Sequence, residues 1–513
     1  MVEQLQQQKN ELHNKLWEMA NELRGNMEAY EFKNYILGLI FYRYLSEKAA
    51  MFMEELLQND DITYEEAWEE EEYREGLIEE SIDTLGYVIE PNYLFSHVIQ
   101  MIEERTFSID YLEEVINGIV ESTRGQESEQ DFDGLFEDMD LKSSKLGKEI
   151  KERSKLIGTI LQTIDTIDFH IQDMEVDVLG DAYEYLIGQF AQTAGKKGGE
   201  FYTPVNMSKL VARLATLGLT DVLSVCDCAC GSAGLLLQVG KYAKVRRYYG
   251  QELTSTTYNL ARMNMMLHGI PYQNFEIINC NTLEEPHFED LKFTVQVANP
   301  PYSAKWSADP KFLDDERFSA YGKLAPKSKA DFAFVQHMIA HMANDGRIAV
   351  LLPHGVLFRG AAEETIRKHI INELNCLDAV IGLPANCFHG TSIPVCCLVL
   401  KKERNENKEN ILFIDASKYY TAGKAMNYIT DEDIDRIVNA YTDRKDIEKF
   451  CHVATMEEIR ENDYNLNIPR YVDTFEEEDP IDIPAVKQEI KDLEEKKAGI
   501  KTELEALFQE LGV

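Results

Sequence analysis

Residues 222–237 read VLSVCDCACGSAGLLL, an apolar run followed by a turn of small residues and then by a second apolar run. The first run, 222–226, has the length and residue types of a buried strand, and the second opens a helix. Small residues let the backbone of such a turn approach a ligand closely, and the amide groups at the start of the helix point outward. The stretch therefore predicts a strand, a binding turn and a helix in direct succession.

Strand-like and helical stretches alternate beyond this turn. A stretch rich in small residues at 189–199 precedes it and is typical of a mobile loop ahead of the strands of a new domain. Alternation of strands with helices predicts a mostly parallel, doubly wound sheet. We therefore expect an α/β domain with a Rossmann-like sheet over residues 166–410. Its further strands are expected at 247–250, 275–278, 293–298, 347–352, 377–381 and 395–400.

The residues before the sheet are expected to form a separate helical domain. Apolar residues recur there at helical spacing, for example at Leu16, Met19 and Leu23, and no proline occurs before Pro91. Apolar positions at this spacing form one face of an amphipathic helix. The pattern predicts an α-helical N-terminal domain at residues 1–165.

The C-terminal region, residues 411–513, is predicted to end in an amphipathic helix. Regular patterning weakens after residue 410, and the last helical pattern covers 484–511, with Pro484 suited to its first turn. The apolar stripe of this helix can pack on a helix of another subunit or on the body of the same chain. We interpret this C-terminal helical tail as a subunit contact.

Composition indicates a soluble globular protein. The chain has 513 residues, of which 44% are hydrophobic, which is enough for two or three domains with real cores. No apolar run approaches the ~18 residues of a membrane span, and the N-terminus lacks the pattern of a signal peptide, so we expect a cytoplasmic protein with no membrane partner. Nine cysteines, mostly in apolar runs, predict reduced, buried thiols. No metal is expected at the closely spaced Cys226, Cys228 and Cys230.

The chain is strongly acidic, and the acidity is concentrated near its start. The formal net charge is −39, and residues 1–150 hold 36 Asp and Glu against 12 Lys and Arg. Such a surface repels phosphates. We therefore expect the isolated chain to bind DNA poorly at physiological salt, and any binding of nucleic acid to need a partner.

Polar residues follow the predicted strands where those strands end. Asp227 would repel a pyrophosphate but could accept a hydrogen bond from an ammonium group, as S-adenosylmethionine would present, and the spacing of Gly231 and Gly234 is sparser than a dinucleotide fingerprint. Glu252, about twenty residues beyond the turn, is placed to bind ribose hydroxyls. Asn281, after the third strand, could contact an adenine edge. These residues are expected on one rim of the sheet.

The fourth predicted strand is followed by Asn299-Pro300-Pro301-Tyr302. Prolines fix φ and donate no hydrogen bond, so backbone carbonyls near Asn299 are left as acceptors beside its amide oxygen, and Tyr302 offers a stacking face. Such a loop suits a planar amine, for example the exocyclic NH2 of a nucleobase. An ordinary turn at the end of a strand is the alternative, since Asn-Pro is a common turn dipeptide.

Taken together, these motifs resemble the modification (M) subunits of type I restriction-modification systems, which are N6-adenine DNA methyltransferases. The resemblance covers nearly the whole chain. It is carried by 16–45, Gly199-Glu200-Phe201-Tyr202-Thr203-Pro204, 227–234, Asn299-Pro300-Pro301-Tyr302, Lys329-Ala330-Asp331-Phe332-Ala333-Phe334, Leu351-Leu352-Pro353-His354-Gly355 and Asn465-Leu466-Asn467-Ile468-Pro469-Arg470-Tyr471.

The resemblance implies transfer of a methyl group from S-adenosylmethionine to N6 of a flipped adenine in duplex DNA. It implies a complex with a specificity subunit that reads the sequence, a second M subunit and a restriction (endonuclease/translocase) subunit. The loop 299–302 would hold the adenine. The residues implied in cofactor binding are Glu200, Phe201, Tyr202, Thr203, Pro204 and Val205 on the methionine side, Gly231, Ser232, Ala233 and Gly234 beside them, and Asp227, Glu252 and Asn281.

Three positions depart from the family pattern Asp-Pro-x-Cys-Gly-Ser-Gly-Gly and its neighbours. Cys228 stands in place of the proline, which removes rigidity. Ala233 stands in place of a glycine, and we expect its φ to be one that a residue with a Cβ adopts readily. Asn281 stands where many related methyltransferases have Asp, and its amide oxygen can still accept a hydrogen bond. We expect the changes at Cys228 and Ala233 to be tolerated.

Two alternatives remain open at the level of sequence. A methyltransferase acting on a glutamine amide of a protein or on an RNA amine would use the same kind of loop, and the acidic charge favours a substrate other than DNA. A non-catalytic subunit that binds DNA or a nuclease is the second alternative. The resemblance over nearly the whole chain favours the DNA methyltransferase.

Overall fold

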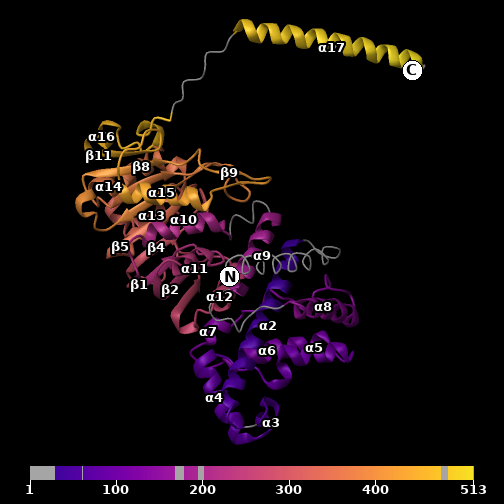
Figure 1. Ribbon diagram of the computed structural model, residues 1–513. Coiled ribbons are helices and arrows are strands. Elements are labelled where there is room, and N and C mark those ends of the chain that lie inside the picture. Colours follow the sequence, from indigo (N-terminus) through magenta and orange to yellow (C-terminus); the bar gives the residue numbers. More distant parts are fainter. Residues whose placement is uncertain (1–28, 61, 168–177, 195–201, 475–482, 512–513) are drawn as a thin grey trace. The chain divides into compact units, whose positions relative to one another are not determined.

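Figure 1 shows the computed structural model, which describes residues 29–60, 62–167, 178–194, 202–474 and 483–511. The chain divides into two compact units, Met1–Val472 and Asp473–Val513. The first unit holds a helical part and a large sheet, and the second holds the helix α17 (Ile483–Leu511), as expected from the sequence. Among the described residues, no helix is both long enough and apolar enough to cross a membrane.

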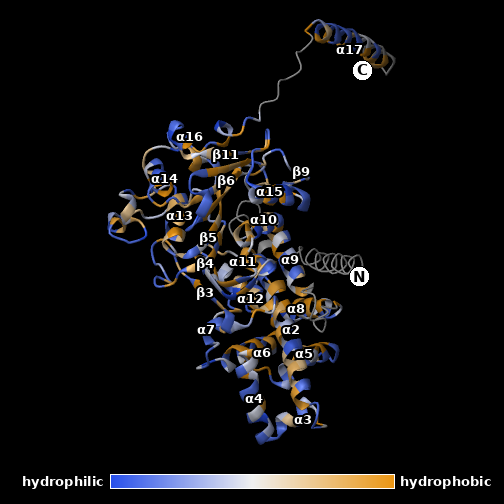
Figure 2. Cartoon of the chain, turned by 60° about the vertical axis from the view of Figure 1, so that its left-hand side comes forward, coloured by the Kyte–Doolittle hydropathy of each residue, from blue (hydrophilic) through white to orange (hydrophobic). Residues whose placement is uncertain are grey.

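The described residues between 29 and 167 are helical and include no strand, which confirms the helical N-terminal part of the predicted fold. Its long helix α2 (Ala29–Leu57) fully buries Leu39, Phe41 and Tyr42. These positions point in different directions around the helix, so α2 lies inside this part. Hydrophobic residues, orange in Figure 2, gather on α2, α5 and α6. The other helices are α3 (Tyr64–Glu69), α4 (Glu71–Leu85), α5 (Phe95–Glu103), α6 (Ile109–Ser122), α7 (Glu129–Phe132) and α8 (Ile150–Asp165).

The second part of this unit is built on a nine-stranded sheet with the spatial order β11-β8-β6-β7-β5-β4-β1-β2-β3. All seven strands expected from the sequence are present, and β8 and β11 are additional. Strands β1 to β5 pair in parallel among themselves, and β6 is parallel to β8. The bounds are β1 (Asp221–Asp227), β2 (Lys244–Glu252), β3 (Phe275–Asn279), β4 (Phe293–Ala298), β5 (Met342–Pro353), β6 (Leu377–Gly382), β7 (Val395–Lys401), β8 (Asn410–Asp415) and β11 (Cys451–Thr455).

Strand β7 interrupts the parallel order, because it pairs antiparallel with both β5 and β6. Parallel neighbours need a long crossover, usually a helix, whereas antiparallel neighbours accept a shorter loop. Residues 383–394 separate β6 from β7 and contain no helix. The expected parallel order therefore does not extend to β7, and β11 is likewise antiparallel to its neighbour β8. A separate hairpin, β9 (Thr421–Ala422) and β10 (Asn427–Tyr428), lies outside the large sheet.

Helices cover both faces of the sheet, as a doubly wound fold requires. Successive residues of β5 point to opposite faces, so that Leu351 belongs to one core and Leu352 to the other. On the first face α10 and α15 lie side by side (Figure 1), and Arg213 pairs with Asp435 between them at 2.6 Å. That face carries α10 (Val205–Thr216), α11 (Gly234–Gly240), α12 (Ser255–Leu267) and α15 (Asp431–Asp443), and the other carries α13 (Asp331–Ala340), α14 (Ala362–Asn372) and α16 (Met456–Glu461).

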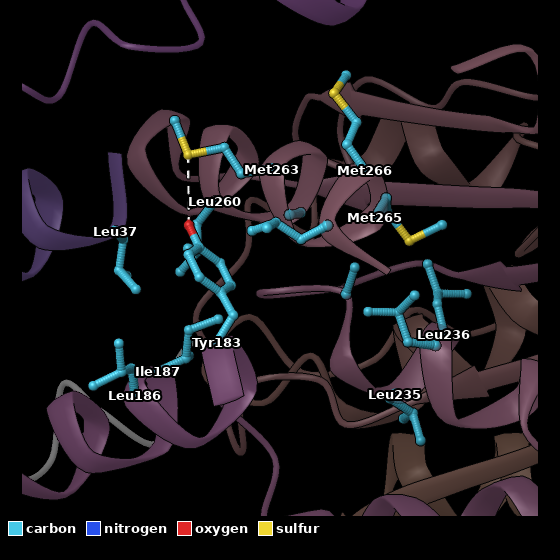
Figure 3. Close-up of a cluster of buried hydrophobic side chains, with 14 of the residues drawn as sticks. Leu37, Tyr183, Leu186, Ile187, Leu235, Leu236, Leu260, Met263, Met265 and Met266 are labelled. Atoms are coloured by element: carbon cyan, nitrogen blue, oxygen red, sulfur yellow. Dashed lines mark hydrogen bonds between the residues drawn. The ribbon is translucent and has the colours of Figure 1, made fainter. Parts of the chain in front are cut away.

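Helix α9 (Val178–Ala194) corrects one expectation. Residues 189–194, predicted to begin a loop, form its last turns, because Phe190 and Ala191 continue its buried face. The rest of that predicted loop, 195–199, lies outside the described residues. Figure 3 shows the apolar cluster in which α9 meets α2, α11 and α12, and in it the Tyr183 hydroxyl contacts the Met263 sulfur at 3.6 Å.

Polar contacts also join the helical part to α12. The Asp138 carboxylate accepts hydrogen bonds from Thr256 Oγ1 at 2.5 Å and from Asn259 Nδ2 at 2.8 Å. The Tyr44 hydroxyl donates to the carbonyl of Met266 at 2.7 Å. All nine cysteines are buried and free, and their burial agrees with the apolar runs in which most of them lie.

Candidate active site

Four parallel strands place their carboxyl ends at one edge of the sheet. They are neighbours in the order β4-β1-β2-β3 and end at Ala298, Asp227, Glu252 and Asn279. Ligands of open α/β sheets bind beyond this edge. The residues that the sequence marked at the ends of different strands are therefore brought to one rim, and the loop that starts at Asn299 follows β4 directly.

Hydrogen bonds fix the orientation of the Asn299 side chain. Its Nδ2 donates to Thr203 Oγ1 at 3.0 Å, and its Oδ1 accepts from the Tyr302 hydroxyl at 2.7 Å. Burial raises the pKa of the Tyr302 phenol well above its usual value, so the hydroxyl stays protonated and acts as the donor. The amide oxygen keeps a second lone pair for a further donor. Pro300 is buried, whereas Pro301 is exposed.

The segment Tyr202–Val205 lies against this loop through Thr203. Pro204 is the N-cap residue of α10, and Val205 is the first residue of that helix. The Tyr202 hydroxyl lies over Gly188 of α9, where a Cβ would meet it at 2.8 Å. The segment predicted to hold the methionine part of a cofactor is thus in contact with the loop predicted to hold an amine. Two other residues of that prediction, Glu200 and Phe201, lie outside the described residues.

The turn after β1 is held by two buried carboxylates. Asp227 Oδ1 accepts from the amide of Ala229 at 2.9 Å, and Glu252 Oε2 accepts from the amide of Gly231 at 3.0 Å. Glu252 Oε1 also accepts from the amide of Thr254 at 2.8 Å. Burial raises the pKa of Asp227 to about 7 and also raises the pKa of Glu252. Two carboxylates with raised pKa values at one rim favour a ligand that carries positive charge or donates hydrogen bonds.

The backbone of this turn differs from the expectation at Ala233. Ala233 has a φ of 64°, in the left-handed region, and so has Gly231 with a φ of 54°. The prediction that Ala233 adopts a φ open to residues with a Cβ is therefore wrong. The position of Ala233 in the fold explains this conformation. Residue 233 ends the turn, and its carbonyl accepts a hydrogen bond from the amide of Leu237 in the first turn of α11. A Cβ on the next residue, Gly234, would meet Glu184 Oε1 at 2.8 Å.

We expect Ala233→Gly to raise the free energy of unfolding by about 1 kcal/mol, because glycine adopts a left-handed φ without the steric penalty that alanine bears. Urea unfolding of the two proteins measures the difference. Ala229→Gly in the same turn is the matched control. Its φ is not positive, so glycine there should lower stability by increasing the conformational entropy of the unfolded chain. Equal changes in both variants would contradict the strain at Ala233.

Two further predicted residues have structural contacts at the rim. Asn281 Oδ1 accepts from the amides of Leu283 and Glu284 at 3.2 and 3.3 Å, so this oxygen shapes the turn after β3. Ser232 is buried, and its carbonyl accepts from Asn264 Nδ2 at 2.8 Å. No group of three or more His, Cys, Asp or Glu in the described part of the chain is arranged to hold a metal ion.

Phe388 is a residue of this site that the sequence analysis did not predict. It is buried in the loop after β6, and its ring lies edge-on to that of Tyr302, with centroids 6.0 Å apart and an angle of 82° between the planes. In the sequence, the feature that could have indicated Phe388 is its position shortly after the end of a central strand. Together with Tyr302 it forms an aromatic corner next to Asn299.

Known proteins resemble this chain in sequence and in fold. Residues 174–480 match the family model described as N-6 DNA Methylase, and residues 12–164 match that of the HsdM N-terminal domain. The chain is 38% identical to the type I restriction enzyme MpnII methylase subunit of Mycoplasma pneumoniae, over 99% of this chain and 97% of that protein. A crystal structure of a type I restriction-modification system methyltransferase subunit from Streptococcus thermophilus is 44% identical, with a TM-score of 0.83 over 90% of this chain and 99% of that one.

The doubly wound sheet and its Asn-Pro-Pro-Tyr loop, taken with these matches, define an adenine-specific DNA methyltransferase acting at N6. Within that class, the chain belongs to the family of methylase subunits of type I restriction-modification systems. The resemblance seen in the sequence and the predicted fold class are both confirmed.

Proposed function

We propose that the protein transfers a methyl group from S-adenosylmethionine to N6 of an adenine flipped out of duplex DNA. The observation that carries this proposal is the hydrogen-bonded chain from Thr203 through Asn299 to Tyr302. It joins the segment predicted to bind the cofactor to the loop predicted to bind the base. Direct transfer requires donor and acceptor to be held in contact, and a short connection between the two sites supports this.

The rim beyond β1 and β2 fits S-adenosylmethionine. Gly231 and Ala233 have left-handed backbone and carry no atom beyond Cβ, so a ligand could lie close to the backbone of the turn. Asp227 suits the ammonium group, and Glu252 suits the ribose hydroxyls. When bound, the cofactor supplies an electrophilic methyl group on its sulfonium. We assign to the same site the remaining predicted residues Glu200, Phe201, Tyr202, Thr203, Pro204, Val205, Ser232, Gly234 and Asn281.

We assign Asn299, Pro300, Pro301 and Tyr302 to the adenine. Its N6 would donate one hydrogen to Asn299 Oδ1 and the other to the Pro300 carbonyl. Two acceptors placed in this way draw the nitrogen toward tetrahedral geometry and leave its lone pair free for the methyl group. Tyr302 would stack on the base and Phe388 would meet its edge, which offsets part of the few kcal/mol needed to flip it. The proton leaves to solvent after transfer.

We further propose that the chain works in a complex with a specificity subunit, a second methylase subunit and a restriction subunit. A net charge of −39 opposes binding of DNA by this chain alone, so another subunit must supply contacts to the phosphates. The terminal helix within residues 411–513 suits contact with another subunit, because apolar side chains along α17 are exposed. They include Ile490, Leu493, Ile500, Leu504, Leu507 and Phe508.

The pH dependence of cofactor binding tests the role of Asp227. Its carboxyl is half protonated near pH 7, and a bound ammonium group favours the ionised form. The affinity for S-adenosylhomocysteine, measured by calorimetry, should therefore rise by about tenfold between pH 6 and pH 7.5. Asp227→Asn should remove the rise. Methylthioadenosine, which lacks the amino acid part, should show no such rise, and an equal rise for both ligands would contradict the assignment.

The function itself is tested on the assembled protein. The chain is co-purified with its specificity subunit and incubated with S-adenosylmethionine and duplex DNA, and N6-methyladenine is mapped. We expect methyl groups on adenine within one recognition sequence. Methylation of a protein glutamine or of RNA instead of DNA would contradict the proposal and favour the first alternative. Failure to bind S-adenosylmethionine would favour a non-catalytic assembly subunit.

A further inference from the structure

A buried carboxylate lies directly behind the loop proposed to hold adenine. Asp331, the first residue of α13, is 1% exposed, and its Oδ1 accepts from the backbone N–H of Ser303 at 2.7 Å. Ser303 follows Tyr302 and has a φ of 51°, in the left-handed region that residues with a Cβ disfavour. The Ser303 hydroxyl also lies 3.5 Å from Asp331 Oδ2. Asp331 therefore supplies a charge-assisted contact that stabilises an unfavourable backbone conformation at the end of the loop.

Arg359 holds this carboxylate in place. Its Nη2 donates to Asp331 Oδ2 at 3.1 Å, and its Nη1 lies 3.2 Å from Oε1 of Glu363. Glu363 is 2% exposed, so one guanidinium lies between two buried carboxylates. Burying a carboxylate is unfavourable unless it is paired. The ion pairs thus offset the cost of burying Asp331 and hold its carboxylate behind Ser303.

Gly355 leaves the space that the guanidinium occupies. A Cβ at Gly355 would lie 2.5 Å from Arg359 Nη2 and 2.7 Å from its Cζ, closer than van der Waals contact allows. Gly360, five residues later, differs in this respect, because a Cβ there would meet only Glu364 Oε2 at 3.6 Å. An alanine at Gly355 would therefore displace Arg359, whereas one at Gly360 would not.

We propose that Asp331, Arg359 and Glu363 are positioning residues for methyl transfer. They act through the backbone of Ser303, which sets the direction of Tyr302 and hence the hydrogen bond from its hydroxyl to Asn299 Oδ1. Loss of this support would let the loop leave the geometry in which Asn299 and Tyr302 hold the base, without changing the turn after β1. This inference rests on the proposed roles of Asn299 and Tyr302.

The first test compares Asp331→Asn with Asp331→Ala in the complex with the specificity subunit. Asparagine keeps an acceptor for Ser303 but loses the charge that pairs with Arg359, and alanine removes both. We expect kcat to fall about tenfold for asparagine and about a hundredfold for alanine. The Kd of S-adenosylhomocysteine should stay within about twofold, since the turn after β1 is untouched. The fluorescence of 2-aminopurine at the target adenine should change with kcat, because it reports the placement of the flipped base.

The second test uses the two glycines as a matched pair. We expect Gly355→Ala to lower kcat about as much as Asp331→Asn does and Gly360→Ala to leave it unchanged. Arg359→Lys keeps the charge but cannot bridge two carboxylates, so it should also lower kcat. It provides the same test if one of the alanine variants does not fold.

Three outcomes would overturn the inference. The first is unchanged kcat and 2-aminopurine emission in the Asp331 and Arg359 variants. The second is an equal effect of the two glycine substitutions, and the third is a parallel loss of kcat and cofactor affinity. Failure of Asn299→Ala to affect methylation would instead reject the proposed function. If Asn299 is essential and Asp331 is dispensable, only the positioning role fails.

Discussion

Replacing Asn299 with alanine is expected to lower methyl transfer by about 10³-fold while leaving the affinity for S-adenosylhomocysteine within about threefold. The side chain supplies the acceptor proposed for adenine N6, and it lies in the loop after β4, apart from the turn that carries Gly231 and Glu252. Its loss removes an interaction that matters most in the transition state. Methyl incorporation into duplex DNA and calorimetry with S-adenosylhomocysteine measure the two quantities in the complex with the specificity subunit.

The partners of Asn299 should show graded effects. Tyr302→Phe removes the hydroxyl that orients the amide oxygen, and Thr203→Val removes the acceptor for Nδ2. Each change should lower kcat by about tenfold, the effect of one hydrogen bond. Thr203→Ser keeps the hydroxyl and should retain most of the activity. Tyr302→Ala, which also removes the stacking face, should lower kcat further.

An exposed asparagine provides the control for this series. Asn92 is exposed in the helical part, and Asn92→Ala should leave both methylation and cofactor affinity unchanged. Undiminished methylation by Asn299→Ala and Tyr302→Ala, in proteins that still bind the cofactor and still assemble, would reject the roles assigned to this loop.

Replacing Asp378 with alanine is expected to lower the free energy of unfolding by about 3–5 kcal/mol. Asp378 is fully buried in β6, and its carboxylate accepts from the Tyr441 hydroxyl at 2.7 Å. Arg404 Nε lies 3.3 Å away, and Lys401 and Arg444 contact the same carboxylate at 3.5 and 3.4 Å. Without Asp378, three cations in or near the protein interior would lose their shared anion. Urea unfolding measures the difference.

The effect of Asp378 should depend on pH. Burial alone would raise the pKa of this carboxyl, but Lys401, Arg444 and Arg404 hold it below the ordinary value. A carboxyl with a lowered pKa contributes stability above its unfolded-state pKa of about 3.9 and loses that contribution as pH falls through its folded-state pKa. The difference in free energy of unfolding between the wild-type protein and Asp378→Ala should therefore be largest near pH 7 and should decrease below about pH 4.

Asp345 is an exposed aspartate that offers a matched control. Asp345→Ala should change the free energy of unfolding by less than about 0.5 kcal/mol at pH 7. If Asp378→Ala lowered the free energy of unfolding at pH 7 by no more than this control does, the contacts around Asp378 would not stabilise the fold.

Much of the active-site rim could be predicted from the sequence, for a simple geometric reason. Parallel strands of one sheet end at the same edge, so residues that follow different strands converge there even when they are far apart along the chain. Asp227, Glu252 and Asn299 were found in this way. Their roles toward cofactor and base remain proposals, but their common location follows from strand patterning alone.

Elements with weak local signals were missed or wrongly predicted. Strand β11 is short and includes the partly exposed His452, so it shows no continuous apolar run. Strand β8 has only four consecutive apolar residues, which do not separate a strand from a helix. The helical continuation of α9 to Ala194 depends on the burial of Phe190 against other parts of the chain. Patterning within a short window does not reveal such burial.

The sequence by itself determined the class of the fold, the helical N-terminal part, the terminal helix and the strand ends that carry the site, because each depends on local periodicity or on neighbouring residues. Only the tertiary structure decided how the site is held. The contact between Thr203 and Asn299 joins residues 96 positions apart, and Asp331 reaches Ser303 across 28 positions. The left-handed φ of Ala233 and the antiparallel β7 also depend on the surrounding structure, since packing and loop connections can select conformations that local preference disfavours.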